Sequence, residues 1–143
     1  MTPHFSLDEL TFSDTAVRLG IDNSPSPEIL KNLLTLAHGL EDVRTLLGDK
    51  PLRISSGFRC RTLNNVIGGS RTSAHMEGFA ADFTCPEYGS PLKIVHALAR
   101  MALSCDQIIQ EGNWVHVSFD PRRRGEVLTA HFGPNGTSYT KGV

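Results

Sequence analysis

Trp114-Val-His-Val-Ser-Phe119 alternates in the way that is typical of a β-strand with two unlike faces. Its two valines and its phenylalanine share one face, which we expect to lie against the core. Trp114, His116 and Ser118 share the other face. The strand pattern therefore predicts that His116 points away from the core, toward a cleft.

The segments around this strand predict an α+β fold. Asp106–Gln110 is the preceding strand, joined to it by the tight hairpin signal Gly112-Asn113. Further strands are expected at residues 52–55, 78–83 and 127–132. A short helix is expected to start in the capping box Ser6–Glu9, and further helices are expected at residues 27–47, 61–66 and 92–103. Ser26-Pro27 and Ser90-Pro91 each pair an N-cap serine with a proline at the first helical position. Helices come early and paired strands late, which predicts one small domain over residues 1–143. Its sheet is expected to be mainly antiparallel and packed against helices.

Composition excludes some classes of function. The chain has 14 Lys+Arg against 15 Asp+Glu, which leaves no electrostatic footprint for nucleic acid. The one basic run, Arg122–Arg124, is interpreted as a solvated turn. No apolar run approaches the roughly 18 to 20 residues that span a bilayer, so no membrane insertion is expected.

The cysteines and the N-terminus predict synthesis in the cytoplasm. Cys60, Cys85 and Cys105 are odd in number and form no Cys-x-x-Cys motif, which favours free, mostly buried thiols in a reducing compartment. Met1–Ser6 lacks the basic and apolar regions of a signal peptide. A substrate outside the cytoplasm would then require separate delivery of the protein.

His75, Asp82 and His116 are the candidate metal ligands. Small residues lie between His75 and Asp82, so a loop followed by a strand can turn both side chains toward one point. Two imidazoles and one carboxylate are a common ligand set for catalytic zinc, whose fourth position stays open for water. A carboxylate base is also needed, and Glu111 is the first candidate, with Glu77 as the alternative. Spacing alone leaves a chance arrangement open.

Three ordered motifs strengthen this interpretation through a resemblance to a family. They are Ser55-Ser-Gly-Phe-Arg-Cys-Arg-Thr-Leu-Asn64, then Ser73-Ala-His75 with Gly78 and Ala81-Asp82, then Asp106-Gln-Ile-Ile with Glu111 and Trp114-Val-His-Val-Ser118. Together they resemble the M15 family of zinc peptidases. The likeness is greatest to the short branch related to D-Ala-D-Ala carboxypeptidases and phage peptidoglycan endopeptidases. It implies the fold of the Hedgehog and D-Ala-D-Ala peptidase group.

The resemblance also implies roles for single residues. His75, Asp82 and His116 match the three zinc ligands of the family, and Arg59 matches an arginine that binds substrate and stabilises the oxyanion. The sequence departs from the pattern at the base. Many relatives have the catalytic carboxylate three residues before the last histidine, where this chain has Asn113.

Other residues are weaker candidates. Ser73 and Trp114 are expected to contact substrate, although loop capping and ordinary packing explain them equally well. His38 and His96 lie in helical segments and are not expected to be ligands, whereas His131 on a late strand is a minor candidate to approach the site. Cys85 is close to Asp82 in sequence, but the family pattern assigns it no role.

Two functions follow from the resemblance. The first is a zinc peptidase that cuts the peptide stems of bacterial peptidoglycan, in which zinc-bound water attacks the amide carbonyl, Glu111 transfers the proton, and zinc and Arg59 stabilise the oxyanion. The absence of a signal peptide would suit a phage or prophage endolysin that acts on the cell wall after release, as a monomer. The alternative, which Asn113 keeps open, is a catalytically inactive zinc-containing module that binds cell-wall peptides.

Overall fold

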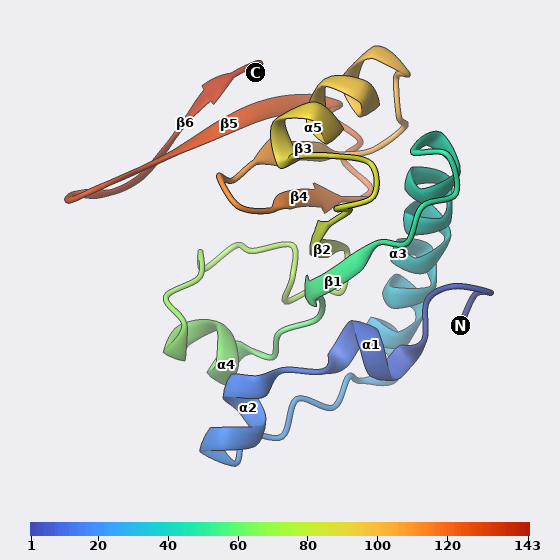
Figure 1. Ribbon diagram of the computed structural model, residues 1–143. Coiled ribbons are helices and arrows are strands. Elements are labelled where there is room, and N and C mark those ends of the chain that lie inside the picture. Colours follow the sequence, from blue (N-terminus) through green and yellow to red (C-terminus); the bar gives the residue numbers. More distant parts are fainter.

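Five helices and six strands make up the computed structural model, which describes residues 1–143 (Figure 1). The helices are α1 (Leu7–Thr11), α2 (Asp14–Leu19), α3 (Pro27–Leu46), α4 (Arg61–Val66) and α5 (Pro91–Arg100). The strands are β1 (Arg53–Ser56), β2 (Ala80–Thr84), β3 (Gln107–Gln110), β4 (Val115–Ser118), β5 (Glu126–Gly133) and β6 (Gly136–Lys141). The α+β class is thereby confirmed. No helix combines the length and the apolar character needed to cross a membrane.

Serine caps start the helices as the sequence predicts. The hydroxyls of Ser6, Ser26 and Ser90 accept hydrogen bonds from backbone N–H groups in the first turns of α1, α3 and α5. Pro27 and Pro91 follow two of these caps at the first helical position, where a missing N–H costs nothing. Helix α2, capped by Ser13, was not predicted as a separate element.

The six strands form one sheet in the order β1-β2-β4-β3-β5-β6. All neighbours are antiparallel except β3 and β5, which run parallel. Strand β6 was not predicted, and it forms with β5 a long hairpin that reaches beyond the rest of the sheet (Figure 1). The mainly antiparallel sheet of the prediction is confirmed.

The two faces of the sheet differ in what covers them. Val115 and Val117 are fully buried in a hydrophobic cluster that also contains Phe83 and Ile108 from neighbouring strands and apolar residues of α3 and α5. Residues directly opposite each other on neighbouring strands point to the same face. His116 therefore lies on the face away from this cluster, together with its cross-strand partners Asp82 and Ile109. We call this the site face.

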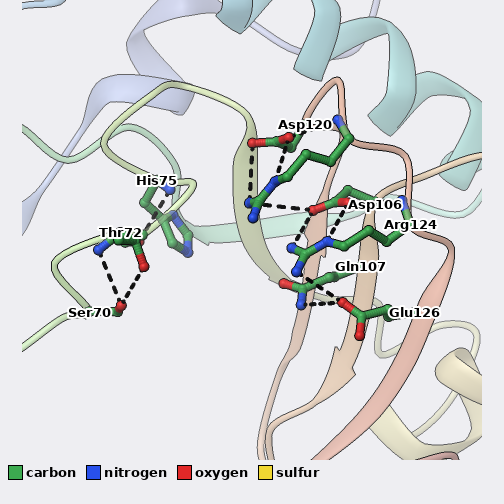
Figure 2. A network of polar contacts seen from close by, with 10 residues as sticks. Ser70, Thr72, His75, Asp106, Gln107, Asp120, Arg124 and Glu126 are labelled. Carbon is green, nitrogen blue, oxygen red and sulfur yellow. Dashed lines mark hydrogen bonds and ion pairs between the residues drawn. The ribbon is translucent and has the colours of Figure 1, made fainter.

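An ion-pair network joins the start of β3 to the start of β5 (Figure 2). The side chain of Asp106 is fully buried and accepts hydrogen bonds from Arg124 Nε at 2.9 Å, from a terminal guanidinium nitrogen at 2.8 Å and from the Arg124 backbone N–H at 3.0 Å. Arg124 also pairs with Glu126, and Arg122 pairs with Asp120. Residues 122–124 do form the predicted turn. The three arginines are exposed, as a solvated turn requires, and Arg124 in addition neutralises a buried carboxylate, which the sequence did not predict.

The cysteines behave as predicted. Cys60, Cys85 and Cys105 form no disulfide bond, and the last two are buried. Burial is the main reason that the pKa of Cys105 is raised to about 11, with a further contribution from the neighbouring Asp106. A thiol with so high a pKa remains protonated and unreactive at neutral pH.

Asp106→Asn is expected to lower the free energy of unfolding at pH 7 by about 1–3 kcal/mol, because charge-assisted hydrogen bonds to a buried group are lost. The hydrogen bonds from Arg124 hold the pKa of Asp106 below its ordinary value. This contribution is therefore present above the pKa of the unfolded carboxyl and is lost as the pH falls through the lower folded pKa. Urea unfolding should show a full difference between parent and variant at pH 7, shrinking below about pH 4.

Asp49→Asn is the matched control for this experiment. Asp49 pairs with Arg44 at 3.4 Å, but its side chain is 70% exposed, so the expected loss is under about 1 kcal/mol. A difference for Asp106→Asn that stays constant into strong acid would contradict the assignment of its effect to the carboxylate charge.

Candidate metal centre

The register of β2 against β4 brings the first two candidate ligands together. Asp82 lies directly opposite His116 in this antiparallel pair, and both side chains point to the site face. Asp82 Oδ1 lies 3.0 Å from His116 Nδ1. The backbone hydrogen bonds between β2 and β4 are sufficient to bring these two side chains together, so their positions follow from strand pairing.

His75 reaches the same point from the loop that precedes β2. Its ring Nδ1 lies 2.7 Å from the carbonyl oxygen of Gly57, and its backbone N–H donates to Ser73 Oγ at 3.2 Å. Its own carbonyl oxygen accepts a hydrogen bond from the Arg59 backbone N–H at 3.1 Å. The side chain is only 2% exposed. These contacts fix both the position of the loop and the orientation of the imidazole.

Gly57 is required for this arrangement for a second reason. A Cβ atom at this position would overlap the backbone carbonyl oxygen of Leu10, which belongs to α1. The next residue, Phe58, donates its backbone N–H to the same Leu10 oxygen at 2.8 Å. Only glycine therefore lets the chain pass close enough to α1 to present its own carbonyl to His75.

The facing atoms of His75 and Asp82 are suited to binding a cation and not to hydrogen-bonding each other. The Gly57 carbonyl can only accept, so Nδ1 of neutral His75 carries the hydrogen and Nε2 keeps a lone pair. That nitrogen faces Asp82 Oδ1 at 3.3 Å. Two acceptors so close repel each other unless a proton or a cation lies between them. The extra proton is disfavoured, because burial lowers the pKa of His75 despite the nearby Asp82 charge.

Distances agree with this interpretation. The three donor atoms of His75, Asp82 and His116 all lie within 4.8 Å of one another. Donor atoms around a tetrahedral zinc ion at 2.0–2.2 Å are about 3.4 Å apart. Burial by itself would raise the pKa of Asp82, but the charges and hydrogen bonds of the two histidines outweigh it and hold that pKa well below its usual range. Asp82 is therefore ionised and available as a ligand.

Glu111 is brought to the site, whereas Glu77 is not. Glu111 follows β3, and its backbone N–H donates to the Trp114 carbonyl across the Gly112-Asn113 turn at 3.0 Å. Its carboxylate Oε1 lies 3.8 Å from His116 Nδ1. Burial raises the pKa of Glu111, and the Asp82 charge acts in the same direction. Glu77 is exposed on the His75 loop and has no ion pair with any of the three ligands.

Arg59 supplies positive charge beside these carboxylates. It donates from a terminal guanidinium nitrogen to Ser73 Oγ at 3.2 Å, while its Nε is buried without a hydrogen-bond partner. Burial lowers the pKa of Arg59, and the charges of Asp82 and Glu111 oppose that change. An arginine remains protonated in such surroundings. Ser73 therefore holds both Arg59 and the backbone of His75 in place.

The remaining candidates lie in different places. Trp114 is on the site face, and its ring centroid is 6.2 Å from that of Phe132 on β5. His131 points away from the site face, because it pairs with Ser138 and its ring contacts the Thr140 hydroxyl at 2.8 Å. The minor candidate His131 therefore does not approach the site. The helical His38 and His96 are exposed, and Cys85 belongs to the core cluster.

Asn23 is a positioning residue that no pattern in the sequence singles out. Its side-chain amide donates to the carbonyls of Thr11 and Phe58 at 2.9 and 3.0 Å, and its oxygen accepts from the Cys60 N–H at 2.7 Å. It thereby holds the backbone on both sides of Arg59. These partners are distant in sequence, so neither spacing nor periodicity points to them. The turn-rich composition around Asn23 predicts a loop and nothing more.

Comparison with known proteins adds two findings. A family model described as Peptidase M15 matches residues 3–118. A stretch of 58 residues is 40% identical to the zinc D-Ala-D-Ala carboxypeptidase of Streptomyces albus G, and it covers 41% of this chain and 23% of that protein. The chain thus spans less than a quarter of the length of this curated relative. The β5–β6 hairpin lies outside the residues that the family model matches.

Added Zn²⁺ is expected to bind one ion per chain and to raise the unfolding temperature, since a ligand at 100 times its Kd adds about 2.7 kcal/mol of stability. His75→Ala and His116→Ala are expected to weaken binding more than about 100-fold, because loss of a residue that merely orients a ligand already costs about 10- to 100-fold. Isothermal titration calorimetry measures both. His96→Ala, an exposed histidine on α5, is the control and should bind as the parent does. Equal affinity of all four proteins would refute the site.

Proposed function

The chain belongs to the peptidase M15 family, and we propose that it hydrolyses peptide bonds of bacterial peptidoglycan with the help of a zinc ion. The proposed ligands are His75, Asp82 and His116. The observation that carries the proposal is the convergence of these three donors within 4.8 Å, with the Glu111 carboxylate 3.8 Å from one of them. A metal site alone is common among proteins, whereas one with a buried carboxylate and a buried arginine beside it favours hydrolysis.

Zinc fits this set of donors. Two imidazoles and one carboxylate leave a coordination position free, as catalytic zinc sites do. When bound, the ion supplies a Lewis acid that polarises the scissile carbonyl and activates water. The Gly57 carbonyl supports the role of His75, because a hydrogen bond to Nδ1 directs the lone pair of Nε2 toward the ion.

Glu111 is the proposed general base. It accepts a proton from the attacking water and passes that proton to the amine that leaves when the C–N bond breaks. Two features support this role. Its carboxylate lies beside a proposed ligand, and its pKa is raised by burial, which brings it nearer to the neutral pH at which a group can both take and give a proton. The proposed base is therefore supplied from a different sequence position than in many relatives, whose carboxylate stands where this chain has Asn113.

Arg59 is the proposed partner of the charge that develops on the carbonyl oxygen. Its guanidinium donates a hydrogen bond to Ser73, and the charges of Asp82 and Glu111 oppose the lowering of its pKa by burial. Both observations support a position of Arg59 beside these carboxylates. A preorganised cation of this kind stabilises a transition state by up to about 3–4 kcal/mol.

The choice of peptidoglycan stems as substrate rests on the relative and on the resemblance. The Streptomyces protein is named for the D-Ala-D-Ala bond, and the stretch that it shares with this chain is 40% identical. We further propose that the protein acts on the cell wall as an endolysin of phage or prophage origin.

Glu111→Gln is expected to lower the rate of peptidoglycan hydrolysis about 10²- to 10⁴-fold, the usual contribution of a general base. Zinc content should stay at the parent level, because Glu111 is not a ligand. Purified peptidoglycan is digested with parent or variant, new amino termini are counted, and the fragments are identified by mass spectrometry. A parallel digestion with a chelator should give no release.

Glu77→Gln is the matched control, since Glu77 is an acidic residue of the His75 loop but lies exposed. It should cleave like the parent. Loss of activity in Glu77→Gln with normal activity in Glu111→Gln would reverse the assignment of the base. A parent that binds stem peptides and zinc but never releases an amine would establish the inactive binding module instead.

A further inference from the structure

The β5–β6 hairpin places aromatic side chains beside the proposed catalytic groups. Leu128 lies opposite Ile109, which is itself opposite His116, so alternate residues of β5 from Leu128 onward lie on the site face. Ala130 and Phe132 are therefore on this face, and Tyr139, the partner of Ala130 on β6, is too. The site face thus continues from the metal ligands across two further strands.

One row of side chains leads from Glu111 to Tyr139. Gln110 pairs with Thr129, so the following residues, Glu111 and Ala130, are neighbours in the parallel pair. Ala130 pairs with Tyr139. By this register Ala130 lies between Glu111 and Tyr139 on the site face. Ala130 is 7% exposed, whereas Tyr139 is 53% exposed and free to meet a ligand.

Phe132 packs the hairpin beside the site. Its ring centroid lies 6.2 Å from that of Trp114, and a Cβ atom built at Gly112, next to Glu111, would lie 3.9 Å from the Phe132 ring. Burial raises the pKa of Tyr139, and the charges of Glu111 and Asp82 act in the same direction. At its start the hairpin is held by the Asp106–Arg124 pair.

Proton transfer from Glu111 determines which part of a substrate lies near Tyr139. We call the residues that follow the cleaved bond the leaving half. Their first amine must lie within hydrogen-bond reach of Glu111, so the leaving half starts next to this carboxylate. Tyr139 lies beyond Glu111 on the side away from Asp82 and His116. On the basis of the proposed function, we propose that Tyr139 is a specificity-determining residue whose ring contacts the leaving half of the peptide substrate.

The proposal predicts a preference for peptides that continue beyond the cleaved bond. Two synthetic stem peptides are compared. Both contain the same residues before the bond whose cleavage the peptidoglycan digestion identifies. One ends one residue after that bond, and the other ends three residues after it. Tyr139→Ala should raise KM for the longer peptide about tenfold, the scale of one lost aromatic contact, and leave kcat unchanged. KM for the shorter peptide should change less than about twofold. Tyr139→Phe keeps the ring and should recover most of the loss.

Binding is measured separately from turnover. Trp114 is the only tryptophan, so its fluorescence reports peptide binding to zinc-loaded Glu111→Gln protein, with and without Tyr139→Ala. Ser138→Ala is the control, because Ser138 is the neighbour of Tyr139 on the opposite face of β6. Circular dichroism and unfolding temperature establish that each variant is folded.

The outcomes separate this inference from the proposed function. If the parent releases amines from peptidoglycan but Tyr139→Ala treats both peptides as the parent does, the role of Tyr139 is refuted and the peptidase remains. An equal loss for both peptides, or a loss in Ser138→Ala of the same size, would also overturn it. If the parent cleaves nothing and no peptide binds, both the proposed function and this inference fail.

Discussion

The antiparallel pairing of β2 with β4 is the interaction on which the site depends. It places Asp82 opposite His116 with 3.0 Å between their donor atoms. A shift of one residue would turn one of them into the core and bring a valine or an alanine to the site face. The fully buried valines of β4 make such a shift costly. The same apolar contacts that stabilise the fold therefore also keep the two proposed ligands together.

Parts of the site that are not on the sheet are held by a few long-range hydrogen bonds. Gly57 orients His75, Ser73 binds both His75 and Arg59, and Asn23 holds the backbone around Arg59. Each of these residues acts through backbone groups or short polar side chains, which have few conformations to lose on ordering. These hydrogen bonds constrain the loops where they approach the proposed metal ligands. This constraint is what preorganisation of a catalytic site requires.

Local patterns predicted much of this structure, and long-range contacts account for what was missed. The alternation in Trp114–Phe119 correctly separated a core face from a face that carries His116, and serine-proline caps located the starts of α3 and α5. Strand β6 was missed although a Gly-Pro-Asn-Gly turn at residues 133–136 precedes it. No local signal could show that Arg124 meets Asp106, because that pair depends on parallel pairing of β3 with β5.

A crystal structure of the zinc-loaded protein, with anomalous data collected at the zinc absorption edge, tests the central claim most directly. We predict a single strong anomalous peak, with His75 Nε2, an oxygen of Asp82 and His116 Nδ1 at about 2.0–2.2 Å from the ion. The Glu111 carboxylate should lie beside the ion without replacing any of these ligands. A peak at other residues, or no peak between the three side chains in zinc-saturated crystals, would contradict the account.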